Sequence, residues 1–251
     1  MNSLHAPLFL CASSGNKGIV IFIHGFMGST GQFAGYAKIV HQHGLSAAAL
    51  LLPGHGGSAK DFGTGTFELW QGHVNSEIER FFQSYSDIWL VGHSMGGLLS
   101  INAAVKYSKH VRGIFVIACP FRLTTLSLHS LKIRLIQIFA GKKNPIKATY
   151  LGRAGVPVSP RLIWNTASPA KELRMRLMPA AINNLANVRI PVLAVYSTSD
   201  ELTSIRSLET LKSGLSGTQF EQIVLTDSLH GYYPEHERVI IEKALLKFIL
   251  Q

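Results

Sequence analysis

Short apolar runs recur along the chain, and stretches of helical length with one apolar face separate them. Within the runs, apolar and polar positions hardly alternate, which is typical of strands covered on both faces of a sheet. The predicted strands are 19–23, 47–52, 88–91, 114–118, 192–196 and 222–225, with one more short strand near 8–11. The predicted helices are 30–43, 66–85, 98–106, 205–215 and 234–250. This alternation predicts an α/β fold with a mostly parallel, doubly wound sheet.

The alternation is interrupted once, over residues 121–189, which we call the basic segment. No apolar run within it resembles the predicted strands. Residues 126–139 predict an amphipathic helix, residues 170–185 predict a second helix interrupted by Pro179, and glycine and proline punctuate the stretch between them. We expect a core made of residues 1–120 and 190–251, with the basic segment inserted as a helical cap over one edge of the sheet.

Charge distinguishes the basic segment from the rest of the chain. The 251 residues carry a formal net charge of +10, with 47% hydrophobic and 15% charged residues, which fits one globular domain with a sizeable core. The basic segment holds a net +11, because Glu172 is its single acid, and the remainder holds a net −1. Its twelve basic residues are Arg122, Lys132, Arg134, Lys142, Lys143, Lys147, Arg153, Arg161, Lys171, Arg174, Arg176 and Arg189.

Cysteine content and the N-terminal residues bear on location. Cys11 and Cys119 are too few for a disulfide framework or a zinc site, and their apolar surroundings predict reduced, buried thiols. No apolar stretch approaches the roughly 20 residues that span a bilayer. The apolar patch 6–12 is preceded by no lysine or arginine, unlike a secretory signal. The expectation is a cytoplasmic protein, with peripheral attachment to a membrane left open by the basic segment.

A Gly-His-Ser-Met-Gly motif at 92–96 lies between a predicted strand and a predicted helix. This context is typical of a nucleophile elbow, in which a tight, strained turn exposes Ser94 at the edge of the sheet. Gly92 and Gly96 would let the strand and the helix pass close to the serine. The alternative interpretation is a turn in which Ser94 merely caps the helix.

Acyl transfer by a serine needs a base, an acid that orients the base, and donors for the oxyanion. His230, in the loop before the last helix, is the candidate base, and Asp200, directly after the 192–196 strand, is the candidate acid. They follow the serine in the chain order Ser…Asp…His. Glu201 and Asp227 are competing acids, and Asp200 is alternatively a residue of a local turn or helix cap.

Two glycine-containing loops follow the first long strands. In His-Gly-Phe-Met-Gly at 24–28, the amide of Phe26 is our candidate for one oxyanion donor, and the amide of Met95 is the other. A plain strand–helix turn is the alternative, while a phosphate-binding loop lacks the required glycine spacing and lysine. The Pro-Gly-His-Gly loop at 53–56 contains His55, which we interpret as a structural hydrogen-bonding residue.

Taken together, these motifs resemble the α/β-hydrolase superfamily, and within it bacterial carboxylesterases and monoacylglycerol lipases. The resemblance covers residues 18–120 and 190–251 and fails over the basic segment, where caps of the family vary. It implies Ser94 as nucleophile, His230 as base, Asp200 as its orienting acid, and the Phe26 and Met95 amides as oxyanion donors.

The function expected from this resemblance is hydrolysis of carboxylic esters through an acyl-enzyme, with no metal or organic cofactor. Thioesterases and carbon–carbon bond hydrolases use the same triad, and a non-catalytic binding protein of the same fold is a further alternative. The basic segment is open to three interpretations: a solvated surface, a site that attracts anionic substrates, or an attachment to anionic membranes through its 126–136 stretch. Nucleic-acid binding is disfavoured, because no recognition motif accompanies the charge.

Overall fold

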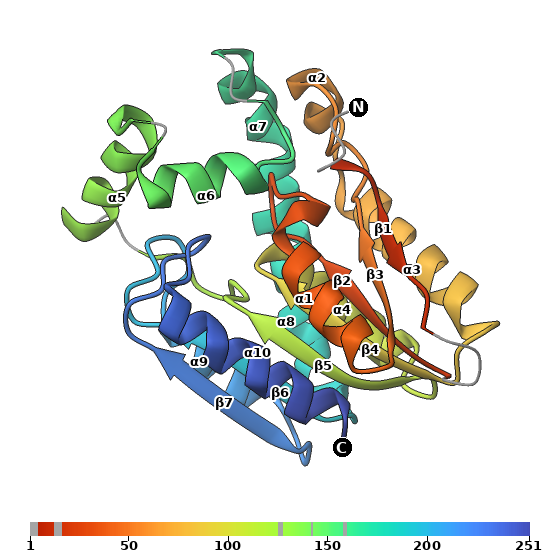
Figure 1. Cartoon of the computed structure of the whole chain (residues 1–251). Helices are drawn as coiled ribbons and strands as arrows, with labels where there is room; N and C mark the ends of the chain where they lie inside the picture. Colours follow the sequence, from red (N-terminus) through yellow and green to blue (C-terminus); the bar gives the residue numbers. More distant parts are fainter. Residues whose placement is uncertain (1–4, 13–16, 125–127, 142, 158–159) are drawn as a thin grey trace.

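The computed structural model describes residues 5–12, 17–124, 128–141, 143–157 and 160–251. These residues contain seven strands in one sheet with the order β1-β3-β2-β4-β5-β6-β7 (Figure 1). Among them β1 pairs antiparallel with β3, and the other pairs are parallel. The strands are β1 (Leu8–Leu10), β2 (Gly18–Ile23), β3 (Ser46–Leu50), β4 (Asp87–His93), β5 (Val111–Ile117), β6 (Val192–Ser197) and β7 (Phe220–Leu225). The predicted mostly parallel α/β sheet is therefore confirmed.

Helices connect the strands and fall into a group that covers the sheet and a group that lies beyond its edge (Figure 1). The helices are α1 (Ala34–Gln42), α2 (Ala59–Gly63), α3 (Phe67–Phe82), α4 (Met95–Lys106), α5 (Leu128–Phe139), α6 (Pro145–Arg153), α7 (Pro160–Glu172), α8 (Met178–Asn184), α9 (Arg206–Gly214) and α10 (Glu235–Ile249). The five predicted helices correspond to α1, α3, α4, α9 and α10.

The hydrophobic core consists of one layer on each face of the sheet. On one face Ile19, Ile21 and Ile23 of β2 pack in a cluster with α3, α4, α8 and α9. On the other face Val20 and Phe22 pack with α1 and α10. Successive side chains of a strand point to opposite faces, so a strand between two helical layers must be apolar throughout. This explains why the runs seen in the sequence lack alternation.

Two helices near the predicted site differ from the sequence-based expectation. Helix α4 begins at Met95 and not at residue 98, because the chain reverses at Ser94 itself and leaves no linker. Helix α2 was not predicted, although Ser58 and Asp61 form a capping box that starts it. A five-residue helix is too short for an apolar period to reveal it, and the capping pair was the available signal.

The basic segment lies between β5 and β6 and contains α5 to α8. Its predicted first helix corresponds to α5, although residues 125–127, 142 and 158–159 lie outside the described residues. The structure adds detail to the rest of the basic segment. The stretch 141–160 contains α6, whose start carries Asn144 as a side-chain cap and Pro145 in the first turn. The expected helix 170–185 is the end of α7, a π-helical turn over Leu173–Leu177, and α8 with Pro179 in its first turn, where proline is tolerated.

The two parts of the basic segment relate differently to the core. Leu177, Ala181 and Leu185 belong to the core cluster on the α4 face. Helices α5, α6 and α7 instead lie beyond the edge of the sheet (Figure 1). No helix among the described residues is long and apolar enough to cross a bilayer.

The cysteines divide between surface and core. Cys119 is buried, as predicted, and burial raises the pKa of its thiol. Cys11 is exposed, so the expectation of a buried thiol there was wrong. It follows β1, which is the edge strand of the sheet formed by the described residues.

Candidate active site

The predicted site residues all follow the carboxyl ends of parallel strands. Phe26 follows β2, Ser94 follows β4, Asp200 follows β6 and His230 follows β7. In open α/β sheets, ligands bind at this edge, because the carboxyl ends of parallel strands meet there. The structure brings Ser94, His230 and Asp200 into one hydrogen-bonded chain and places all three side chains in the interior.

Ser94 occupies a strained turn between β4 and α4. Its φ and ψ are 53° and −121°, a region that non-glycine residues rarely adopt. A Cβ on Gly96 would lie 2.0 Å from the carbonyl oxygen of Ile23, and a Cβ on Gly92 would lie 2.4 Å from that of Gly96. Both positions therefore require glycine. Although Ser94 is at the N-cap position, its side chain makes no capping hydrogen bond, so the helix-cap interpretation does not describe it.

The imidazole of His230 lies between Ser94 and Asp200. Its Nε2 is 3.0 Å from Ser94 Oγ, and its Nδ1 is 2.9 Å from Asp200 Oδ2. The second carboxylate oxygen of Asp200 accepts hydrogen bonds from the amides of Leu202 (2.8 Å) and Thr203 (2.7 Å). These two bonds fix the carboxylate, which in turn fixes the orientation of the imidazole.

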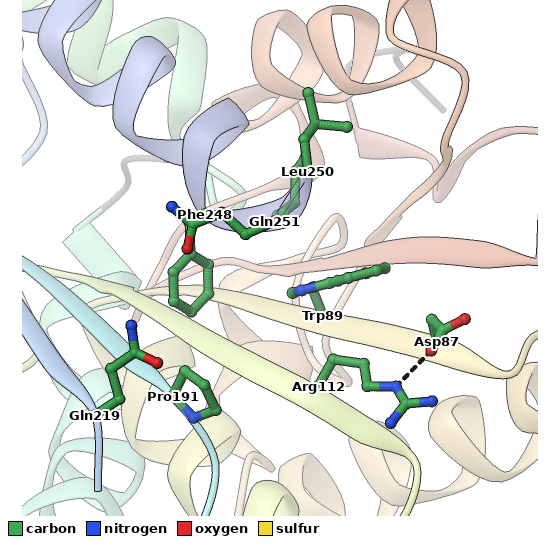
Figure 2. Close-up of a pocket in the computed structure, with 9 residues that line it drawn as sticks. Asp87, Trp89, Arg112, Pro191, Gln219, Phe248, Leu250 and Gln251 are labelled. Carbon is green, nitrogen blue, oxygen red and sulfur yellow. Dashed lines mark hydrogen bonds and ion pairs between the residues drawn. The ribbon is translucent and has the colours of Figure 1, made fainter.

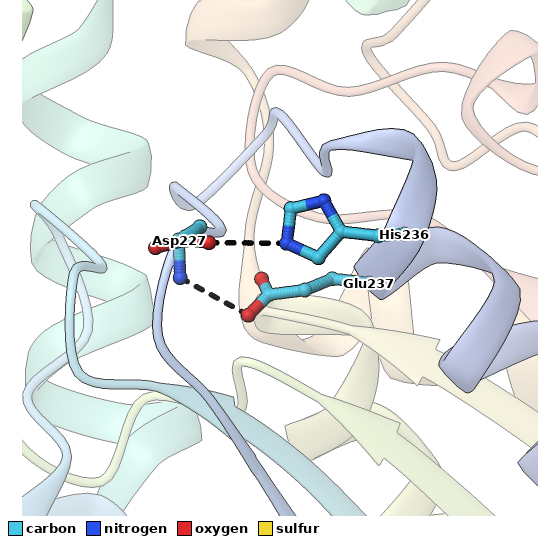
Figure 3. A group of neighbouring side chains, drawn as sticks. All are labelled: Asp227, His236 and Glu237. Carbon is cyan, nitrogen blue, oxygen red and sulfur yellow. Dashed lines mark hydrogen bonds and ion pairs between the residues drawn. The ribbon is translucent and has the colours of Figure 1, made fainter.

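The two competing acids occupy other positions. Glu201 Oε2 accepts a hydrogen bond from the backbone N–H of His230 (2.9 Å), so it contacts the base through the main chain. Asp227 is exposed and pairs with His236 at 3.0 Å (Figure 3). The neighbouring Glu237 accepts hydrogen bonds from the amides of Thr226 and Asp227, and this cluster supports the loop that leads to His230.

The proposed oxyanion donors belong to two segments that meet near Ser94, the turn after β2 and the start of α4. Residues 25–28 form a turn in which the Gly28 N–H donates to the Gly25 carbonyl (2.9 Å), with Met27 at φ 59°. Phe26 is the second residue of this turn. The amide of that residue takes no part in the hydrogen bond that closes a β-turn. Met95 is the first residue of α4, so its amide has no partner within the helix. A Cβ on Gly25 would lie 2.9 Å from Ser94 Cβ, which shows how closely the turn approaches the serine.

Three buried histidines near the site are held neutral. Burial, and then the other nearby histidines, lower the pKa of His24, and burial lowers that of His55 to about 4. His24 Nδ1 donates to the Gly25 carbonyl (2.9 Å), while its Nε2 accepts from the Leu52 amide (3.1 Å). His55 Nδ1 donates to the Pro53 carbonyl (3.2 Å), which agrees with a structural role. Burial also lowers the pKa of His93, whose Nε2 donates to the carbonyl of His230 (2.8 Å).

His230 differs from these three histidines in its electrostatics. Burial lowers its pKa, but the negative charge of Asp200, the hydrogen bond to it and the charge of Glu201 together outweigh burial, so the pKa is raised above its usual 6.5. A neighbouring carboxylate has this effect because it stabilises the imidazolium form. The arrangement therefore favours proton uptake by His230 from Ser94.

A cavity of ≈ 550 Å³ lies at the opposite edge of the sheet (Figure 2). Its lining includes Asp87 at the start of β4, Arg112 near the start of β5 and Pro191 just before β6. The amino ends of parallel strands do not form ligand sites in this fold class, and none of the predicted site residues lines the cavity. We therefore place the candidate site at the Ser94 edge.

Sequence reasoning expected the basic segment at this edge of the sheet and suspected it of binding substrate, but it missed two of its residues that contact the site. Tyr150 of α6 hydrogen-bonds to Glu201 and to the Gly231 amide, and Arg153 of the same helix hydrogen-bonds to the Gly231 carbonyl. Neither residue belongs to a motif. Only the expected location of the segment indicated such contacts, because a segment inserted at the carboxyl edge of a sheet must contact the loops of that edge.

Comparison with known proteins agrees with the fold and the motifs. A family model described as "Serine aminopeptidase, S33" matches residues 14–153. A thermostable monoacylglycerol lipase from Bacillus sp. (strain H-257) is 24% identical over 242 residues, covering 93% of this chain and 91% of the relative.

Two of the similar solved structures cover nearly all of the chain. The structure described for LipS and LipT, two metagenome-derived lipolytic enzymes, has a TM-score of 0.77 at 21% identity and covers 99% of each chain. A monoacylglycerol lipase from Paleococcus ferrophilus has a TM-score of 0.69 at 17% identity, covering 98% of each. Such likenesses show the fold, and the family model matches more than half of the chain. The protein therefore belongs to the serine aminopeptidase S33 family and has the α/β-hydrolase fold.

Proposed function

We propose that the protein is a serine hydrolase of carboxylic esters, with Ser94 as nucleophile, His230 as general base and Asp200 as the acid that orients it. The observation that carries the proposal is the hydrogen-bonded chain from Ser94 Oγ through His230 to Asp200, which starts at a serine in a strained turn. Strain at a functional residue persists where the surrounding structure enforces it, and the two close glycines do so here.

In the proposed reaction, Ser94 Oγ attacks the ester carbonyl carbon while His230 Nε2 takes the hydroxyl proton. Asp200 stabilises the imidazolium that forms. The carbonyl oxygen becomes an oxyanion, which accepts hydrogen bonds from the amides of Phe26 and Met95. The Met95 amide is also at the start of α4, where the helix dipole favours negative charge. A single such donor contributes about 3 kcal/mol to the stability of the transition state.

Collapse of this intermediate breaks the bond to the alcohol, and His230 donates its proton to the leaving oxygen. An acyl group then remains on Ser94. Water attacks the acyl carbonyl while His230 accepts its proton, and a second collapse releases the acid and returns the proton to Ser94. The sequence of steps needs only the substrate, water and the groups named.

The substrate class proposed is a lipid ester such as a monoacylglycerol. The similarity to the Bacillus lipase supports it, and so do exposed apolar side chains on the helices beyond the sheet edge, among them Leu128 of α5 and Trp164 of α7. Thioesters and carbon–carbon bonds remain alternatives for the same triad, and the family description adds peptides. We keep the ester as the first choice because a relative that is similar over 93% of this chain is a lipase.

A covalent labelling experiment tests this proposal. A fluorophosphonate is expected to phosphonylate the purified protein once, and mass spectrometry of the digest is expected to place the adduct on Ser94. Initial rates with p-nitrophenyl acyl esters, acyl-CoA thioesters and an aminoacyl p-nitroanilide then rank the leaving groups, with the ester expected to be fastest. An adduct on another residue, or no adduct, contradicts the proposed nucleophile. A faster thioester or anilide contradicts the ester assignment.

We further propose that the basic segment, acting as a cap, brings the enzyme to anionic lipid surfaces. Exposed apolar side chains and cations occur together there: Ile163 is 75% and Trp164 is 84% exposed, beside Arg161 on α7. Among the described residues, Arg161 and Arg174 form no ion pair with a carboxylate. This combination is typical of helices that lie in a membrane interface.

Vesicle sedimentation tests the membrane proposal. More protein is expected to pellet with vesicles containing phosphatidylglycerol than with pure phosphatidylcholine, and added salt is expected to reduce the difference, because it screens exposed charges. The double variant Arg161→Glu, Arg174→Glu is expected to abolish that preference. Lys212→Glu with Lys243→Glu, on the distant helices α9 and α10, makes the same change of charge as a control. Equal binding to both vesicle types contradicts the proposal.

A further inference from the structure

The last turn of α6 contacts the loop that carries the candidate base. The hydroxyl of Tyr150 donates to Glu201 Oε1 (2.5 Å) and accepts from the backbone N–H of Gly231 (2.9 Å). Arg153 Nη1 donates to the carbonyl oxygen of Gly231 (2.7 Å). Both polar groups of the residue next to His230 are therefore bound by one helix of the basic segment.

This contact is tight as well as polar. A Cβ on Gly231 would lie 2.8 Å from the ring carbon Cε1 of Tyr150, so the ring packs directly on the backbone of the loop. Burial raises the pKa of Tyr150, and the negative charge of Glu201 raises it further, so the phenol keeps its proton as a hydrogen-bond donor. The loop cannot shift toward α6 without a clash, and shifting away breaks hydrogen bonds.

Glu201 links Tyr150 to the base. Its side chain is buried, with the residue only 1% exposed, and its two oxygens accept from different groups: Oε1 from Tyr150 and Oε2 from the His230 amide. A buried carboxylate is retained only where hydrogen bonds replace its lost hydration. The pair of bonds thus connects the hydroxyl of Tyr150 to the main chain of the residue whose ring takes the proton.

The same segment also holds the turn with the proposed oxyanion donor. The Gly155 amide donates to the Met27 carbonyl (2.8 Å), Ala154 forms a β-bridge with Gly28, and Ser29 Oγ donates to the Arg153 carbonyl (3.1 Å). Residues 150–155 are therefore bonded to both the His230 loop and the turn at 25–28. These two parts of the site are far apart in the sequence, and one short segment of the cap connects them.

We propose that Tyr150 is a positioning residue, which acts through Glu201 and Gly231 to hold His230 in register with the oxyanion turn. This inference rests on the proposed roles of Ser94 and His230 and adds that the placement of α6 sets the geometry of the base. A displacement of about 1 Å at a reacting group lowers a rate by roughly 100-fold, so hydrogen bonds remote from the substrate have kinetic consequences.

Tyr150→Phe is the direct test, because it removes the hydroxyl and keeps the ring that packs on Gly231. We expect kcat for a p-nitrophenyl ester to fall by roughly 10- to 100-fold, because the base is displaced. KM is expected to change by less than about 3-fold, because the groups that bind the substrate stay in place. The remote pair Tyr107 and Glu79 offers a matched control, since a tyrosine hydroxyl also donates to a glutamate there, between α4 and α3. Tyr107→Phe is expected to leave kcat unchanged.

Glu201→Gln gives a second measurement, the pH profile of kcat/KM, which a loss of stability alone would not shift. Glutamine retains an acceptor for the His230 amide but removes the charge. The titratable groups in contact with His230 are Asp200 and Glu201 after β6, neutral His93 of β4 and Tyr233 of its own loop. Tyr150 and Arg153 of α6 bind the adjacent Glu201 and Gly231. Because Glu201 raises the pKa of His230, its loss is expected to move the acid limb of kcat/KM to lower pH. The control Glu79→Gln is expected to leave that limb in place.

The outcomes separate this inference from the proposed function. If Tyr150→Phe keeps the wild-type kcat, or Glu201→Gln leaves the acid limb in place, while Ser94→Ala is inactive, the positioning role is wrong and the triad stands. If Ser94→Ala remains active, the proposed function fails instead. Should Tyr150→Phe lose its thermal unfolding transition, kcat of Glu201→Gln decides the question, because the single oxygen of glutamine cannot accept from both Tyr150 and the His230 amide. An unchanged kcat of that variant contradicts the positioning role.

Discussion

Ser94→Ala is expected to lower kcat for a p-nitrophenyl ester by about 10⁶-fold, the size of effect that removal of a serine nucleophile has in other triad enzymes. The loss follows from geometry, because the hydroxyl is the group that His230 Nε2 contacts, at 3.0 Å. Alanine leaves the oxyanion amides and the binding site intact, so a residual rate of about 10³- to 10⁴-fold over water is expected. Stopped or endpoint assays at high enzyme concentration measure both values.

Ser213→Ala serves as the control for this variant. Ser213 is exposed near the end of α9, where its hydroxyl donates only to the Thr210 carbonyl (3.2 Å). Its replacement is expected to leave kcat and fluorophosphonate labelling at wild-type values. Undiminished turnover by Ser94→Ala, with a wild-type thermal unfolding temperature, would exclude Ser94 as the nucleophile and with it the proposed mechanism.

The fold could be predicted because the sequence patterns of its strands and helices are local and recur along the chain. Every predicted strand corresponds to an observed one. The signal is strongest in β2, β3 and β6, which are buried at every position because helices cover both faces of the sheet. The Ser94 turn carries a similarly strong signal, because close approach of backbone to Gly92 and Gly96 leaves no room for a side chain. Helices α2 and α6 escaped prediction, since short helices reveal themselves by their caps and not by an apolar period.

The sequence predicts the residues of the candidate site, but it does not predict the contacts that hold them in place. Chain order indicated Asp200 over Glu201, yet only the fold shows that Glu201 contacts the main chain of His230 and not its ring. The contact between Tyr150 and Gly231 joins residues 81 positions apart. No local pattern records such a contact, because it depends on how the basic segment packs on the core.

The largest expected effect after Ser94 is that of Asp200→Asn, a loss of about 10⁴-fold in kcat at neutral pH. The reason lies in how Asp200 is held. Its Oδ1 accepts from the Leu202 and Thr203 amides, at 2.8 and 2.7 Å, and asparagine can keep both bonds with its carbonyl oxygen. The side-chain NH₂ then takes the place of Oδ2 and faces His230 Nδ1, where the distance is now 2.9 Å.

An NH₂ at that place can only donate, so Nδ1 must accept and the proton of the neutral imidazole moves to Nε2. This proton then points at Ser94 Oγ, and the ring can no longer take the hydroxyl proton. Replacing the carboxylate also removes the main charge that raises the pKa of His230. Since protonated His230 is inactive, the acid limb of kcat/KM is expected to move to lower pH, and what activity remains is expected to rise toward alkaline pH as hydroxide substitutes for the base.

Asp227→Asn provides the matched control for Asp200→Asn, because it makes the same chemical change on the exposed acid of the His230 loop. Asp227 pairs with His236 and not with the imidazole of His230, so kcat and the acid limb are expected to remain at wild-type values. The reverse result, an active Asp200→Asn and an inactive Asp227→Asn, would assign the orienting acid to the β7 loop. It would also require a rearrangement of that loop, since Glu237 now binds the Asp227 amide and the Asp227 carboxylate pairs with His236.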